Sequence, residues 1–120
     1  MKKAKYFVDA EFKRCTPSCS INDMNQGTLD RLDRVREIAG IPLLLNSAYR
    51  STEHDKARGR SGTGSHTTGR AIDIRCNASG TRYKIVTAAL QAGFTRIGIA
   101  KTFVHLDDSP SHAQQVIWTY

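Results

Sequence analysis

Two segments of the chain carry apolar residues at helical spacing, and each of them ends at a glycine. The first, residues 28–40 (TLDRLDRVREIAG), begins at Thr28, a plausible N-cap, and ends at Gly40, where a helix C-terminal glycine is expected. The second, residues 79–94 (SGTRYKIVTAALQAGF), ends at Gly93 in the same way. Its apolar residues on one side of the predicted helix are Ile85, Val86, Ala89 and Leu90.

Short apolar runs between polar and glycine-rich segments predict strands. Residues 5–12 could also begin as a strand, whereas residues 52–69 form a long polar segment with four glycines. Helices and strands do not alternate in a regular series, so we expect one α+β domain over residues 1–120, with a mainly antiparallel sheet and two principal helices. The runs read as strands are 41–51, 70–76, 95–100, 102–108 and 113–120.

Alternating side chains give two of these strands an aliphatic face and a polar face. In residues 71–74 (AIDI), Asp73 points away from the isoleucines, and in residues 103–107 (FVHLD), His105 and Asp107 point away from Val104 and Leu106. If both aliphatic faces lie on the core, Asp73 and His105 share the opposite face, with Cβ atoms about 5 Å apart if they are cross-strand neighbours.

This polar face has the composition of a metal site. His66, in the glycine-rich segment before the first of these strands, could fold over it as a third ligand. Two histidines and one carboxylate, with a fourth position for water, form a common catalytic zinc arrangement. The spacing alone leaves another interpretation open, in which Asp73 is neutralised by Arg70 or Arg75.

Three segments resemble motifs of peptidase family M15, the zinc D-Ala-D-Ala carboxypeptidases, which include phage endolysins and vancomycin-resistance dipeptidases. NSAYRS (46–51) resembles the upstream S-x-Y-R motif, and FVHLD (103–107) resembles the segment with the last zinc histidine. SHTTGRAID (65–73) resembles the family signature. Its matching residues are Ser65, His66, Gly69, Ala71 and Asp73. The resemblance implies a hedgehog/DD-peptidase-like fold.

The resemblance also implies a role for each matching residue. His66, Asp73 and His105 would bind Zn²⁺, and Arg50 would stabilise the oxyanion or hold a substrate carboxylate. Ser65 would contact substrate or orient its neighbour. The two small residues of the signature would have structural roles. Gly69 would form the turn that leads into the strand, and Ala71 would leave room for the ion or substrate.

One position departs from the family pattern. Many members carry an acidic general base three residues before the last zinc histidine, where this chain has Thr102. The nearest replacement is Asp107, two residues after His105 and on the same face. Asp107 could act as the general base, or it could orient His105 without touching the substrate. Asp108 is a weaker candidate, because it should face the core or a turn.

Composition and charge bear on where the protein acts. Hydrophobic residues make up 39% of the 120 residues, which is ordinary for a globular domain, and the net charge of +7 favours anionic partners. No signal peptide and no run of membrane-spanning length are recognisable. We therefore expect synthesis in the cytoplasm, no membrane insertion, and action on the cell wall after release or delivery, as for a phage enzyme. We also expect a monomer.

The remaining motifs are less specific. Cys15 and Cys19 could form a disulfide, bind metal or stay reduced, and Cys76 makes the number of cysteines odd. We expect Trp118 and Tyr120 to contribute packing rather than stacking on a ligand.

Taken together, these features predict a zinc metallopeptidase that hydrolyses the stem peptides of peptidoglycan, as a carboxypeptidase or an endopeptidase. A zinc-stabilised module that binds the cell wall without catalysis is one alternative. A basic nucleic-acid-binding protein is another, but the arginines are scattered and no aromatic platform accompanies them. We therefore expect no nucleic-acid partner.

Overall fold

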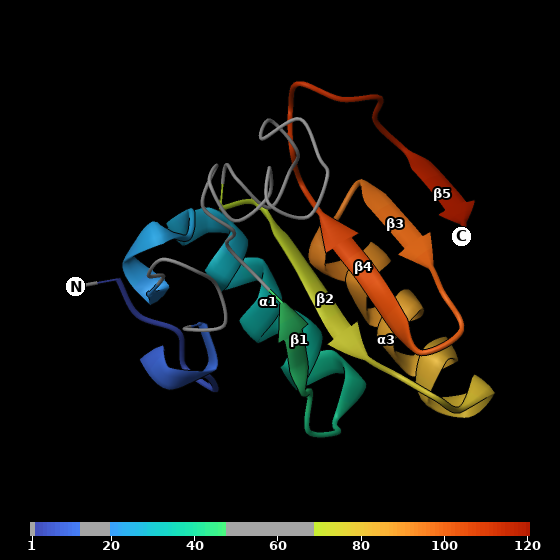
Figure 1. Ribbon diagram of the computed structural model, residues 1–120, viewed down its shortest axis with the longest axis horizontal. Coiled ribbons are helices and arrows are strands. Elements are labelled where there is room, and N and C mark those ends of the chain that lie inside the picture. Colours follow the sequence, from blue (N-terminus) through green and yellow to red (C-terminus); the bar gives the residue numbers. More distant parts are fainter. Residues whose placement is uncertain (1, 13–19, 48–68) are drawn as a thin grey trace, which may run out of the picture.

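A five-stranded sheet packs against two helices in the computed structural model, which describes residues 2–12, 20–47 and 69–120 (Figure 1). The strands are β1 (Leu45–Ser47), β2 (Ala71–Arg75), β3 (Arg96–Ile99), β4 (Phe103–Asp107) and β5 (Val116–Thr119). The helices are α1 (Gln26–Ala39) and α3 (Ser79–Ala92), preceded by the 3₁₀ turns η1 (Asp9–Phe12) and η2 (Ile21–Asp23).

The sheet has the strand order β1-β2-β4-β3-β5. Neighbouring strands are antiparallel except β3 and β5, which run parallel. The predicted α+β class, with two principal helices and a mainly antiparallel sheet, is confirmed. Within the described ranges, no helix is both long enough and apolar enough to cross a lipid bilayer.

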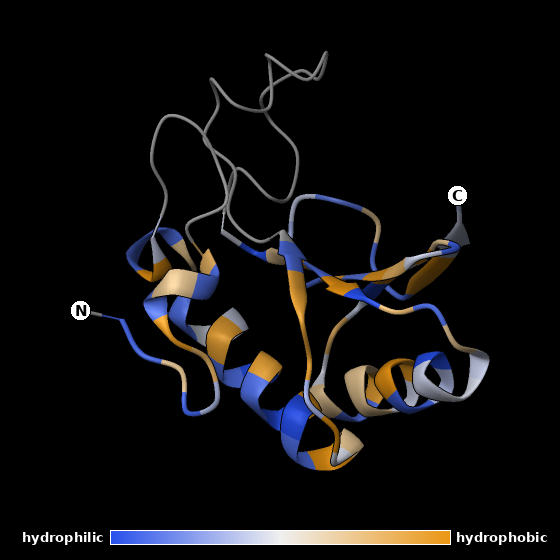
Figure 2. Ribbon diagram, turned by 60° about the horizontal axis from the view of Figure 1, so that its bottom comes forward, coloured by the Kyte–Doolittle hydropathy of each residue, from blue (hydrophilic) through white to orange (hydrophobic). Residues whose placement is uncertain are grey.

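Both helices lie on the same side of the sheet (Figure 2). Buried apolar residues of the helices and the strands form one core cluster. The aliphatic faces of β2 and β4 supply the centre of this core: Ile72, Ile74, Val104 and Leu106 have no exposed surface. Burial of each such side chain contributes about 1.5–3 kcal/mol. This burial leaves the alternate residues of both strands on the opposite face of the sheet, as the alternation predicted.

The helix ends follow the sequence signals only in part. Gly40 and Gly93 end the two helices in the left-handed conformation, with φ of 68° and 101°, as predicted. The predicted N-cap at Thr28 is wrong, because α1 begins at Gln26 and the Asn25 side chain caps it by accepting a hydrogen bond from the Thr28 N–H. Leu90 is 53% exposed, so it does not share the buried side of α3.

Two strand predictions need correction. Residues 5–12 form no strand: the backbone N–H groups of Lys5 and Tyr6 donate to the Asp33 carboxylate on α1, and η1 follows. In the described part of residues 41–51, only Leu45–Ser47 is a strand. Pro42 has no N–H to donate to a sheet, which explains why the strand does not extend over the whole apolar run.

Candidate active site

The pairing of β2 with β4 places Asp73 directly opposite His105. The Nδ1 atom of His105 lies 2.8 Å from the Oδ1 atom of Asp73. His105 is only 7% exposed, although its face of the sheet is opposite the helices. The predicted juxtaposition of these two side chains on one face is therefore confirmed.

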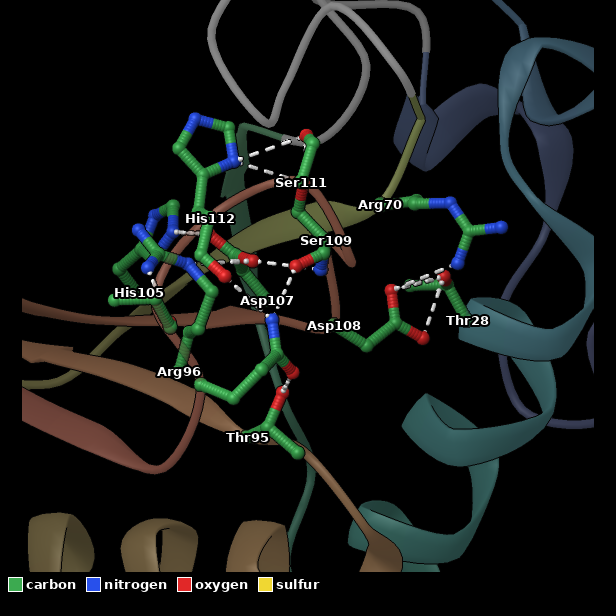
Figure 3. A network of polar contacts seen from close by, with 12 residues as sticks. Thr28, Arg70, Thr95, Arg96, His105, Asp107, Asp108, Ser109, Ser111 and His112 are labelled. Atoms are coloured by element: carbon green, nitrogen blue, oxygen red, sulfur yellow. Dashed lines mark hydrogen bonds and ion pairs between the residues drawn. The ribbon is translucent and has the colours of Figure 1, made fainter.

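Asp107 holds the other end of the same imidazole. Its Oδ2 atom lies 2.9 Å from His105 Nε2, and its Oδ1 atom accepts hydrogen bonds from the Ser109 N–H at 2.9 Å and from Arg96 Nε at 3.1 Å (Figure 3). The Asp107 side chain is fully buried. Asp107 thus has a partner on both carboxylate oxygens, and the His105 ring lies between two acidic groups.

These contacts shift the pKa of His105. Burial, the largest single influence, lowers the pKa of His105, but the hydrogen bonds and charges of Asp107 and Asp73 together outweigh it and raise the pKa above its ordinary value. An imidazolium donates from both ring nitrogens, which matches the placement of one carboxylate at each.

A tryptophan that we expected only to pack lies beside the candidate site. Trp118, on β5, contacts the His105 ring with a centroid separation of 5.4 Å, and the Arg96 guanidinium lies 5.1 Å from the indole centroid. Its proximity depends on the parallel pairing of β5 with β3, which the local sequence pattern does not reveal. One sequence feature could have indicated the contact: Gly98, a glycine inside a predicted strand, which marks a place where another group approaches the backbone closely. Gly98 lies on β3, between the strands that carry Trp118 and His105.

Asp108 belongs to a different cluster from Asp107, on the side of β4 that faces α1. Its carboxylate accepts a hydrogen bond from Thr28 Oγ1 at 2.7 Å (Figure 3). It also pairs with Arg31 Nη1 at 2.6 Å. Arg70 Nη1 lies 3.8 Å from the same carboxylate. Asp108 therefore faces the interior, which is the first of the two orientations expected for it. Arg70, one of the two arginines that we considered for Asp73, lies beside Asp108 instead.

Gly69 connects the start of β2 to the N-terminus of α1. Its φ of +73° is in the left-handed region, and its carbonyl oxygen accepts a hydrogen bond from the Asn25 N–H at 2.9 Å. A Cβ atom at this position would lie 2.3 Å from the Asp23 carbonyl oxygen. The turn expected at Gly69 is confirmed, and both its conformation and its close contact require glycine.

We expect Gly69→Ala to lower the free energy of unfolding by about 3–5 kcal/mol, because it combines left-handed strain with a backbone clash. Gly40→Ala is the matched control, since Gly40 has a φ of +68° but a Cβ atom there would meet nothing within 4 Å. That control should lose only about 1 kcal/mol. Urea unfolding measures both values, and equal losses would show that the contact with Asp23 is unimportant.

Several predicted site residues lie outside the described residues: His66, Ser65, Arg50, Cys15 and Cys19. Across residues 2–12, 20–47 and 69–120, no group of three or more histidine, cysteine, aspartate or glutamate side chains is arranged to hold a metal ion. Cys76 is a buried free thiol. His112 is exposed and lies 2.9 Å from Ser109 Oγ through its Nδ1 atom. The ligand roles of His66, Asp73 and His105 remain predictions.

Comparison with known proteins gives the family. No curated protein matches the chain. The sequence profile described as Peptidase M15 matches residues 5–107, which include β1 to β4 and both helices. The chain therefore belongs to the peptidase M15 family.

Proposed function

We propose that this peptidase is zinc-dependent and hydrolyses peptide bonds in the stem peptides of bacterial peptidoglycan. The observation that carries the proposal is the 2.8 Å approach of His105 Nδ1 to Asp73 Oδ1 across β2 and β4. Membership of the M15 family and the motif around His66 support the same conclusion.

The donor set fits a divalent zinc ion. An imidazole nitrogen and a carboxylate oxygen face each other from neighbouring strands, and Asp107 engages the opposite imidazole nitrogen. A carboxylate that binds the far nitrogen of a histidine ligand is a common support for zinc sites. Asp73 and His105 Nδ1 would therefore hold the ion, with His66 as the third ligand. When bound, zinc would activate water and polarise the scissile carbonyl.

The contacts of Asp107 favour one of its two possible roles. Its carboxylate already accepts hydrogen bonds from the Ser109 N–H and from the charged Arg96, and it faces His105 Nε2. Hydrogen bonds to the ionised form make a carboxylate a weaker base. We infer that Asp107 orients His105 and does not take a proton from water.

The remaining assignments follow the family motifs. Arg50 would stabilise negative charge on the scissile carbonyl or hold a substrate carboxylate, and Ser65 would contact the substrate. The net charge of +7 would favour the anionic polymers of the cell envelope. We propose that the protein reaches the wall after release or delivery and acts as a monomer.

Defined muropeptides test the proposed function directly. We expect mass spectrometry to show new fragments with the zinc-loaded protein, none after chelation, and full recovery when zinc is restored. The fragment masses identify the bond and so separate a carboxypeptidase from an endopeptidase. Zinc binding without any cleavage would instead support a non-catalytic wall-binding module. A salt-dependent shift of DNA mobility without cleavage would support a nucleic-acid-binding protein.

A further inference from the structure

Trp118 reaches the candidate site from two strands away. It lies on β5, which pairs with β3, and β3 in turn pairs with β4, the strand that carries His105. Gly98 on β3 is the cross-strand partner of both residues: it is opposite His105 on one side and opposite Trp118 on the other. The three residues therefore form one row across the sheet.

The missing side chain at Gly98 is what allows the contact. A Cβ atom there would lie 2.7 Å from Cε2 and from Nε1 of the indole, a separation that real Cβ atoms essentially never show. The indole instead extends over Gly98 and meets the His105 ring at an interplanar angle of 51°. Tilted contacts of this kind are favourable for aromatic pairs, so the indole stabilises this orientation of the imidazole ring.

A second contact connects Trp118 with the same imidazole through Arg96. The Arg96 guanidinium lies over the indole, and Arg96 Nε donates to the carboxylate of Asp107, which holds His105 Nε2. Arg96 Nη1 also donates to the Ala113 carbonyl at 2.7 Å, which ties the guanidinium to the segment before β5. Trp118 thus contacts the His105 ring directly, and it also contacts the Arg96 guanidinium, which binds the carboxylate of Asp107.

We propose that Trp118 is a positioning residue for His105. Its indole limits rotation of the imidazole, so that Nε2 stays on Asp107 and Nδ1 stays on Asp73. The proposal rests on the proposed function, since it gives Trp118 a role toward a metal ligand. Loss of the indole leaves the carboxylates of Asp73 and Asp107 available to the ring but removes a restraint on its orientation, so Nδ1 is less well preorganised for the ion.

The metal-free protein provides the first test. Long-range ¹H–¹⁵N NMR spectra report the tautomer and mobility of the His105 ring. We expect one sharp set of signals in the wild type, and broadened or doubled signals in Trp118→Leu. Gly98→Ala should give the same change, because it displaces the indole without removing it. Trp118→Phe, which keeps an aromatic ring, should restore much of the wild-type spectrum.

Ile117→Ala is the matched control. Ile117 precedes Trp118 on the same strand, but it lines a pocket of about 360 Å³ with Leu90 and Phe94, so its loss should leave the His105 signals unchanged. Equal changes in the Ile117→Ala and Trp118→Leu spectra would indicate a general effect on β5. Unchanged His105 signals in Gly98→Ala would overturn the proposal, even if Trp118→Leu failed to fold.

Zinc affinity provides the second test. We expect Trp118→Leu and Gly98→Ala to bind zinc about 10-fold more weakly than the wild type, the lower end of the effect typical for residues that support a metal ligand. Affinity equal to that of the wild type in both variants would count against the proposal. If the wild type bound no zinc, the proposed function would fail, whereas the NMR comparison would still decide whether Trp118 positions the ring.

Discussion

His105→Gln is expected to abolish stoichiometric zinc binding and to lower muropeptide cleavage by more than about a thousandfold. Loss of a single oxyanion-stabilising donor costs about 10²–10³ in rate, and zinc would supply both carbonyl polarisation and water activation. Glutamine is polar and of similar length, but it offers no imidazole nitrogen to the ion. Elemental analysis of the purified variant and a muropeptide assay measure the two losses.

The matched control for this variant is His112→Gln. His112 is exposed, and its Nδ1 atom lies 2.9 Å from Ser109 Oγ. We expect wild-type zinc content and activity in the control. A folded His105→Gln protein that kept about one zinc per chain and normal turnover would refute the ligand assignment of His105.

The central pair of the candidate site could be predicted because burial fixes the register of its strands. In AIDI and FVHLD, a shift of one residue would expose four fully buried aliphatic side chains and bury the polar ones. Period-two alternation in two short segments is therefore enough to place Asp73 and His105 on one face. The same alternation placed Asp107 beside His105, although it could not show which atoms would meet.

Other features depend on contacts between distant segments, and no local pattern encodes them. Thr28 has the side chain of an N-cap, but its hydroxyl donates to Asp108, eighty residues later in the chain, and Asn25 caps the helix instead. Trp118 reaches His105 only because β5 adds to β3 in parallel. A short apolar segment at the end of a chain gives no signal for the direction in which it pairs.

Asp107→Asn separates the two roles that the sequence left open for this residue. An asparagine has one acceptor oxygen, whereas Asp107 accepts on one oxygen from Ser109 and Arg96 and faces His105 with the other. In one orientation the amide N–H₂ group faces the donors of Ser109 and Arg96, and in the other it faces His105 Nε2. In both orientations Arg96 loses its charged partner. If Asp107 orients His105, we expect zinc affinity to fall about 10–100-fold, with turnover largely recovered at saturating zinc.

The general-base role predicts the opposite pattern. Turnover would then stay low at saturating zinc, while the affinity for zinc would remain that of the wild type. Competition with a chromogenic chelator measures the affinity, and kcat at saturating zinc measures the chemistry. Asp108→Asn is the control, because this neighbouring carboxylate pairs with Thr28 and Arg31 on the side of β4 that faces α1, so its substitution should lower stability and leave zinc affinity unchanged. The split between affinity and kcat in Asp107→Asn therefore decides whether the acid acts through His105 or on the substrate itself.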